Sequence, residues 1–263
     1  MGIDYMVTPW FKDIRSMAFH ALYIILIFTL LFNKDKHIKY FLYLWGIAIL
    51  LATIKGYVQR NIGFDTSEMR WLMSGGANTH IIHSGIRYFS FFSDAANYGS
   101  NMAFSLVTYA ICFLYEKNRF DKICWLVVAI ASGYGMMISG TRTALVVAIS
   151  GFVMYTLLAK NIKLFLVSCS FLAVSVGVLK YTTIGNSNQF VRRMRTAFNP
   201  EDASLQVRLI NQKAIKAYMK EAPWGIGLGI GMGSDQLPQN NKYWIVSVTA
   251  PDSTLVYIWM RTG

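Results

Sequence analysis

Three short stretches of the chain combine a charged side chain with small polar residues, and each lies beside apolar sequence. They are Ser139-Gly140-Thr141-Arg142, the segment around Arg208, and Asp252-Ser253. Guanidinium groups bind phosphate oxygens in a bidentate geometry, and a carboxylate can act as a general base. We therefore interpret Arg142 and Arg208 as groups that hold an anion, and Asp252 as a base, with Ser253 orienting a hydroxyl. The simpler alternatives are arginines that bind lipid headgroups and an aspartate that caps a helix.

A second set of polar residues precedes the third apolar run. Arg87 and Asp94 either form an ion pair with each other or line a substrate cavity together with Asn97. His80 and His83 have the spacing of a metal-binding pair, but no third ligand is apparent, so we expect no metal.

Arg192 and Arg195 lie in the longest polar segment of the chain. They form a solvated face, a surface for anionic headgroups, or a phosphate site. Residues 223–233 alternate glycine with apolar side chains. This pattern is typical of a close-packed turn, or of a loop whose backbone a ligand approaches, and it has no dinucleotide-binding register.

The composition indicates a membrane protein. Of the 263 residues, 54% are hydrophobic and 14% are charged, and the net charge is +12. Soluble domains carry about 25% charged residues. A basic protein can bind nucleic acid, anionic lipid headgroups or an anionic substrate. We exclude nucleic acid as a partner because the sequence contains no soluble basic domain.

Long apolar runs predict membrane-spanning helices. The runs are residues 17–32, 40–54, 95–115, 123–139, 143–159, 162–179 and a last one that begins near Asp252. We expect an all-α fold, a polytopic membrane helix bundle with about six or seven transmembrane helices. Since a span rarely stops halfway across the bilayer, we also expect the last helix to be truncated at Gly263.

The loops between these runs predict the orientation. Residues 33–39, 116–122 and 160–163 are rich in lysine and arginine. The helix count places all three loops on one side, which the positive-inside rule makes cytoplasmic. The connections on the other side are then extracytoplasmic.

The same pattern gives the domain organisation. We expect a transmembrane bundle at residues 1–180, an extracytoplasmic loop at 181–251, and the start of a further transmembrane helix at 252–263. Within the long loop, residues 202–221 have the apolar periodicity of an amphipathic helix.

Four motifs in this order resemble the O-antigen ligase and O-antigen polymerase family, over roughly residues 85–263. The motifs are Phe92-Ser93-Asp94-Ala95-Ala96-Asn97-Tyr98-Gly99, Ser139-Gly140-Thr141-Arg142, Arg208 ahead of Ala222-Pro223-Trp224-Gly225-Ile226-Gly227, and Asp252-Ser253-Thr254-Leu255 with Thr262-Gly263. One position departs from the family pattern: the ligases carry histidine where this chain has Asp252.

The resemblance implies a glycosyltransferase that needs no metal and no cofactor. It would join undecaprenyl-diphosphate-linked glycan units to a glycan or lipid A-core acceptor, as polymerase or ligase, at the periplasmic face of the bacterial inner membrane. Arg142 and Arg208 would hold the diphosphate and Asp252 would accept the acceptor's proton. The substrate-binding residues would be Arg87, Asp94, Asn97, Arg192, Arg195 and Ser253.

Two other functions remain open. A transporter or flippase of lipid-linked oligosaccharides would also use cations, but it predicts charges in the middle of the membrane and inverted halves. A sensor or scaffold would not need the ordered arginines and aspartate. The charged residues gather at one face of the predicted bundle, which favours an enzyme acting at the membrane surface over a transporter.

Overall fold

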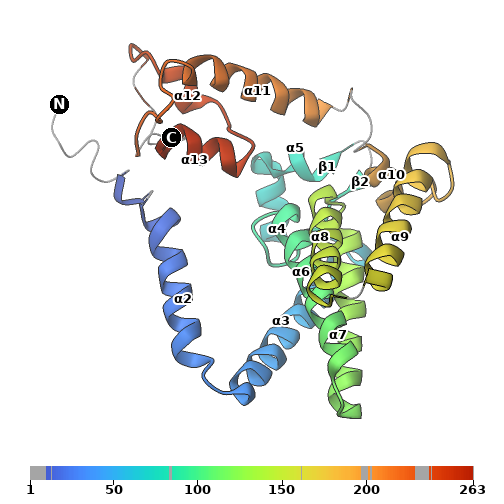
Figure 1. Ribbon diagram of the computed structural model, residues 1–263. Helices are drawn as coiled ribbons and strands as arrows, with labels where there is room; N and C mark the ends of the chain where they lie inside the picture. Colours follow the sequence, from blue (N-terminus) through green and yellow to red (C-terminus); the bar gives the residue numbers. More distant parts are fainter. Residues whose placement is uncertain are drawn as a thin grey trace. The chain divides into compact units, whose positions relative to one another are not determined.

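The chain folds into helices joined by turns and loops. The computed structural model describes residues 10–12, 14–82, 85–160, 162–196, 201, 203–228, 237 and 239–262. One two-stranded antiparallel hairpin, β1 (Ile81–Ile82) with β2 (Gly85–Ile86), accompanies the helices. The helical elements (Figure 1) are η1 (Arg15–Phe19), α2 (His20–Leu31), α3 (Asp35–Asn61), α4 (Thr66–Trp71), η2 (Leu72–Gly76), α5 (Ala77–His80), α6 (Ala95–Tyr115), α7 (Arg119–Ile138), α8 (Arg142–Leu158), α9 (Ile162–Tyr181), α10 (Gln189–Arg195), α11 (Ala203–Met219), α12 (Trp244–Val248) and α13 (Thr254–Thr262).

Every apolar run in the sequence coincides with a helix, so the predicted helical class is confirmed. The run at 40–54 is the core of α3, which extends into the polar residues on both sides. The amphipathic helix predicted at 202–221 is α11. The sequence did not reveal α4, α5, α10 and α12, which are too short to show a period.

The predicted count of six or seven membrane spans is not confirmed. Among the described residues, two helices are long and apolar enough to cross a membrane, α3 and α7. Helices α2 and α8 are apolar but have 12 and 17 residues, whereas a span needs about 20. Helix α6 has 21 residues, but Asn97, Ser100 and Asn101 make its first turns polar.

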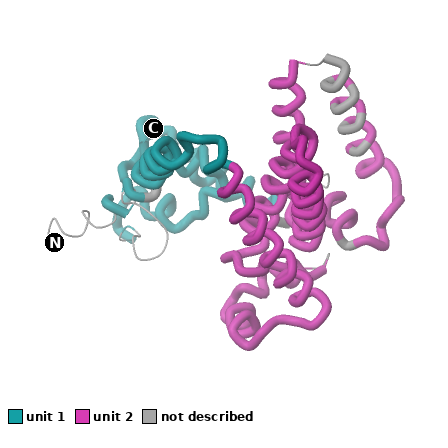
Figure 2. Tube along the Cα trace, turned by 90° about the horizontal axis from the view of Figure 1, so that it is seen from below, with its two compact units in different colours: residues 1–38, 200–263 teal, residues 39–199 magenta. Residues whose placement is uncertain are grey.

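The chain divides into two compact units, shown in different colours in Figure 2. Unit 1 consists of Met1–Ile38 and Pro200–Gly263, and unit 2 of Lys39–Asn199. Each unit has its own apolar core, and we describe them one at a time.

Helix α6 is central to unit 2, where it packs against α7 and α8. Tyr98 of α6 is fully buried and lies where α3 and α7 both carry glycine. A Cβ on Gly56 or Gly135 would come within 2.7 Å of the Tyr98 hydroxyl. The two glycines therefore allow the helices to close around the tyrosine ring, as small residues do at helix contacts.

A polar cluster joins α3 to α7 near the loop predicted to be cytoplasmic. Asp121, in the first turn of α7, is buried and accepts hydrogen bonds from Lys39 Nζ and Tyr43 Oη of α3. Glu116, which follows α6, accepts a hydrogen bond of 3.3 Å from Trp125 Nε1. Because buried charges require partners, this cluster specifies how the ends of α3, α6 and α7 meet.

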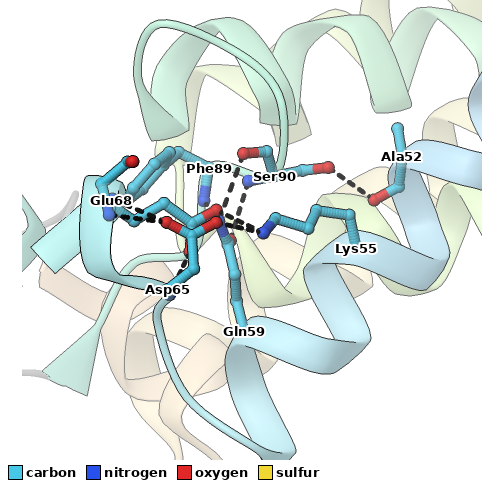
Figure 3. A network of polar contacts seen from close by, with 8 residues as sticks. Ala52, Lys55, Gln59, Asp65, Glu68, Phe89 and Ser90 are labelled. Atoms are coloured by element: carbon cyan, nitrogen blue, oxygen red, sulfur yellow. Dashed lines mark hydrogen bonds and ion pairs between the residues drawn. The ribbon is translucent and has the colours of Figure 1, made fainter.

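A buried glutamine connects the other end of α3 to the loop before α6 (Figure 3). The Gln59 carbonyl oxygen accepts from the backbone N–H of Ser90 at 2.8 Å and of Phe89 at 3.3 Å. Its amide nitrogen donates to Glu68 Oε1 at 2.8 Å and to Ser90 O at 3.2 Å. Ser90 has a left-handed φ of 54°, and its hydroxyl donates to Ala52 O of α3. These bonds fix the course of the loop that carries Arg87.

Helix α4 is held against α3 by charge. Lys55 Nζ lies 2.8 Å from a carboxylate oxygen of Asp65 and 2.8 Å from one of Glu68. Asp65 and Glu68 also form a capping box at the start of α4. The hydrogen bond from Lys55, together with the backbone donors of the box, holds the pKa of Asp65 below its usual range.

Unit 1 has a small core formed by three short helices. Ile215 and Met219 of α11 are buried against Val246 of α12 and Met260 of α13. The turn after α11 is tied to α13, because Ile226 N donates to Met260 O at 2.7 Å. A Trp259 Nε1 hydrogen bond to Pro223 O adds a second connection. These contacts fix α11 relative to the start of α13.

Candidate functional site

The Ser139–Thr141 turn places Arg142 at the first position of α8. Ser139 and Thr141 are buried, and Gly140 has a left-handed φ of 57°. Ser139 Oγ donates to Met136 O, and Thr141 Oγ1 donates to Ala95 O at 2.8 Å. The Ser139 hydroxyl thus satisfies a backbone carbonyl at the end of α7, and the Thr141 hydroxyl ties the turn to the start of α6.

Arg142 is partly buried, and its Nη1 lies 3.4 Å from Thr196 Oγ1, just past α10. The contact joins the start of α8 to the segment that follows α9 in the chain. Thr196 is a neutral partner for the guanidinium.

Arg87 lies in the same region as Arg142. Its Nη2 donates to Thr141 Oγ1 at 3.0 Å, and its Nη1 donates to Thr79 O at 2.9 Å. Arg87 is therefore hydrogen-bonded to the Thr141 side chain, and Arg142 is the next residue in the chain. The structure brings these two sequence-predicted cations together in unit 2.

His80 connects α5 to the first residue of α6. Its Nε2 accepts a hydrogen bond from Ala95 N at 3.0 Å, and its Nδ1 lies 3.0 Å from Gly76 O. The pattern requires a neutral ring with the proton on Nδ1, since Nε2 must act as an acceptor. Burial lowers the pKa of His80, and the nearby Arg87 lowers it further. His83 lies outside the described residues, so the structure does not test the predicted pair.

Asp94 caps α6. Its Oδ1 accepts from Ala96 N at 2.7 Å and from Asn97 N at 2.8 Å. The Asn97 side chain donates to Asp94 Oδ2 at 2.9 Å and to Ser93 Oγ at 2.8 Å. Asp94 and Asn97 thus lie together, and their hydrogen bonds organise the helix start.

Arg192 and Arg195 bind backbone carbonyl groups. Arg195 donates to the carbonyls of Leu179 and Ile184, at 2.9 and 2.6 Å, and to that of Thr182. Arg192 donates to Asn186 O at 2.9 Å. Carbonyls at the end of a helix lack partners within the helix, so these arginines stabilise the end of α9 and the turn after it. This capping role differs from the substrate-binding role predicted from sequence.

In unit 1 the carboxylate of Asp252 meets an amide from α11. Asn211 Nδ2 donates to Asp252 Oδ2 at 2.8 Å. Asp252 has a left-handed φ of 53° and is exposed. Helix α13 begins at Thr254, and Ser253 O accepts from Tyr257 N at 2.9 Å. Ser253, rather than Asp252, therefore occupies the N-cap position, and the predicted alternative of a capping aspartate is corrected.

Arg208 lies one turn before Asn211 on α11. Residues three and four apart share a helix face, so Arg208 and Asn211 extend the face that Ile215 and Met219 bury. Arg208 is exposed, and within the described part of the chain it has no ion-pair partner. Asp252, the predicted base, and Arg208, a predicted cation, thus both lie close to one face of α11.

The glycine-rich stretch after α11 is a turn over the part that is described. Gly225 and Gly227 have φ values of 84° and 103°, which residues with a Cβ rarely adopt. Gly225 N donates to Ala222 O. Residues 229–233 of the stretch lie outside the described residues. The turn interpretation is confirmed for residues 222–228, where it brings the end of α11 onto α13.

Sequence reasoning missed Asn211, Gln59 and the role of His80. Gln59 and Asn211 belong to no recognisable motif, and His80 was considered only as one of a possible metal-binding pair. Each acts through a partner 15 or more residues away. Asn211 alone gave a local signal, since it follows Arg208 by three residues on a predicted amphipathic helix. Among the described residues, no group of three or more histidine, cysteine, aspartate or glutamate side chains could hold a metal ion.

Comparison with known proteins agrees with the motifs. The family model described as O-antigen ligase matches residues 126–263, more than half of the chain. The match includes Arg142, Arg208 and Asp252, whereas Arg87 and Asp94 precede it. No curated protein and no solved structure matches. The chain therefore belongs to the O-antigen ligase family, a family of membrane proteins with a glycosyltransferase-like role in polysaccharide assembly.

Proposed function

We propose that this protein is a bacterial inner-membrane glycosyltransferase that takes its glycan from undecaprenyl diphosphate. It transfers the glycan to a glycan or lipid A-core acceptor at the periplasmic face, without a metal or other cofactor. The observation that carries the proposal is the hydrogen bond between Asn211 and Asp252, one helical turn from Arg208. It supports a site in which a carboxylate and a cation lie close together.

The reaction assigns one role to each charge. The acceptor hydroxyl attacks the anomeric carbon, and the carbon–oxygen bond to the diphosphate breaks. The electron pair leaves with the undecaprenyl diphosphate, and Asp252 takes the acceptor's proton. A base of this kind contributes roughly 10²–10⁴-fold to a rate. Arg208 and Arg142 stabilise the charge that develops on the diphosphate, which is usually the larger effect in such reactions.

The remaining polar residues have supporting roles. Arg87 and Asn97 bind the substrate in unit 2, near the helix start that Asp94 caps, and Ser253 orients the acceptor hydroxyl in unit 1. Arg192 and Arg195 contribute less, because both donate to backbone carbonyls.

The topology that goes with this function is polytopic. We propose that α2, α3, α6, α7, α8 and α9 cross the membrane, with α11 in an extracytoplasmic loop. The supporting observation is the distribution of the basic loops, from which the positive-inside rule predicts periplasmic starts for α6 and α8.

The test is complementation of a deletion strain with single variants. Asp252→Asn, Arg208→Ala and Arg142→Ala should each reduce surface glycan, while the protein remains in the membrane fraction. Lys213→Ala is the matched control, since Lys213 is an exposed cation on α11 turned about 140° from Arg208. Normal glycan with both Arg142→Ala and Arg208→Ala would refute the diphosphate role.

The glycans that accumulate in the deletion strain separate the remaining possibilities. Chains limited to one repeat unit indicate a polymerase, and long chains that remain on the lipid carrier indicate a ligase. Loss of outward-facing lipid-linked repeat units indicates a flippase and contradicts the proposal.

A further inference from the structure

Asp252 has a backbone conformation that its own sequence neighbourhood does not explain. Its φ of 53° is in the left-handed region, which aspartate visits more often than most residues but still rarely. Among the described residues, Ser90 and Lys160 are the other non-glycine residues with positive φ. Ser90 is held there by the bonds to Gln59 and Ala52. A residue in such a conformation persists where its surroundings hold it in place, and such residues gather at functional sites.

The group that holds Asp252 is the Asn211 side chain. Asn211 is partly buried, and its amide donates to Asp252 Oδ2 at 2.8 Å across 41 residues of sequence. The helix that carries Asn211 is fixed to α13 and α12 by the buried side chains of Ile215 and Met219. The amide is therefore presented from a packed helix to a carboxylate at the end of a loop.

We propose that Asn211 is the positioning residue of the catalytic base, an inference that rests on the proposed function. By bonding Oδ2, Asn211 fixes the rotation of the carboxylate and leaves Oδ1 as the oxygen that receives the acceptor's proton. Within the described part of the chain, Asn211 is the one side chain that hydrogen-bonds Asp252.

The chemistry of an amide suits this role. An amide N–H donates to a carboxylate but does not ionise near neutral pH, so it orients Asp252 without competing for the proton. A lysine or arginine at position 211 would form an ion pair and weaken the base. An aspartate would repel it. The cation needed for the diphosphate comes instead from Arg208, one turn away.

The experiment uses the purified full-length protein in lipid nanodiscs. Its substrate is the lipid-linked glycan that accumulates in the deletion strain, and the signal is the undecaprenyl diphosphate released. Asn211→Ala should lower kcat about 10- to 100-fold with little change in KM, because an unpositioned base acts in the transition state and not in binding. Gln212→Ala removes a neighbouring amide from the same helix and should leave kcat unchanged.

Asn211→Asp provides a second readout that a purely structural role would not give. The side chains have nearly the same shape, but the variant places two carboxylates in contact, so its activity should be low near neutral pH. On acidification one proton is shared by the pair, and the protonated carboxyl again donates to its neighbour. Activity of this variant should therefore recover with falling pH relative to the unmodified protein. If Asn211→Ala does not fold, the pH dependence of Asn211→Asp still tests the role of Asn211.

The outcomes separate the two proposals. Full activity of Asp252→Asn would refute Asp252 as the base and with it the role of Asn211, whereas a lack of undecaprenyl diphosphate release by the unmodified protein would refute the proposed function. Loss of activity in Asp252→Asn with normal kcat in Asn211→Ala would overturn the role of Asn211 alone. Equal losses in Asn211→Ala and Gln212→Ala, with no recovery of Asn211→Asp in acid, would also overturn it, since they would indicate general damage to α11.

Discussion

Replacing Gly99 by alanine should displace the Ser139–Thr141 turn through a steric clash. Gly99 lies in α6, where alanine is normally the better residue by about 1 kcal/mol. A Cβ built at this position would overlap Ser139 Oγ and would stand 3.0 Å from Ser139 Cβ and 3.1 Å from Thr141 Cβ. Both neighbours are buried, and their hydroxyl groups are hydrogen-bonded, so neither can move without breaking a bond.

The net cost can be worked out from these two effects. Overpacking a well-packed site costs about 1–3 kcal/mol, and the gain in helix propensity offsets about 1 kcal/mol of that. The expected loss of stability is therefore between about 0 and 2 kcal/mol. Gly133 of α7 is the matched control, because among the described residues a Cβ there would meet only Leu106 Cδ1, at 3.9 Å. Gly133→Ala should be neutral or stabilising, and the difference between the two variants isolates the clash.

Gly99→Ala should also lower the rate of glycan transfer by more than the loss of folded protein explains, because the clash displaces the turn that positions Arg142. A displacement of about 1 Å can reduce a rate about 100-fold. The assays are thermal unfolding of the purified protein, followed by tryptophan fluorescence, and release of undecaprenyl diphosphate. Ser139→Gly removes the two nearest clashing atoms and should restore part of the stability of Gly99→Ala. If Gly99→Ala and Gly133→Ala unfolded at the same temperature with equal activity, the packing argument for this turn would be refuted.

Three further predictions concern single side chains of unit 2. Burial lowers the pKa of His80 in the folded protein, so the stability that the neutral ring contributes is complete above about pH 6.5 and is lost as the pH falls toward the folded-state pKa. The unfolding temperature should therefore fall as the pH is lowered through this range. The fall should be smaller in His80→Gln. Gln59→Leu leaves the N–H groups of Phe89 and Ser90 without their acceptor and should cost about 2–3 kcal/mol in unfolding measurements. Arg195→Ala should lower the unfolding temperature through loss of the carbonyl contacts at the end of α9, and an unchanged temperature would contradict its capping role.

The sequence predicted the helices well because membrane-type helices have a strong local signal. Continuous apolar runs give α3 and α7 directly, and the glycine and proline residues after α11 mark its end. The number of spans stays a prediction, because an apolar run shows that a helix forms but not where the membrane lies around it. Helix α8 illustrates the difference, since it is largely apolar but has 17 residues, fewer than the two helices that are clearly long enough.

The candidate site was predicted in part. Arg142, Arg208 and Asp252 stand in motifs that can be read from the chain, and the structure places Arg208 and Asp252 in the same unit. Their partners could not be predicted, because Asn211 reaches Asp252 across 41 residues and Arg87 reaches Thr141 across 54. Such contacts depend on how helices pack, and a single sequence carries no local record of that packing.

The partners of a charged group distinguish structural charges from reactive ones in this protein. Lys55 is paired with two carboxylates, and Arg195 donates to three carbonyls, so neither has much capacity left for a substrate. Asp252 is hydrogen-bonded by one neutral amide, on one oxygen, and no side chain of the described residues bonds its other oxygen. A group that must accept a proton during a reaction needs to be held without being neutralised. A single amide at Asn211 meets both conditions, which an ion pair could not, and for this reason Asp252 is the carboxylate to which we assign the chemistry.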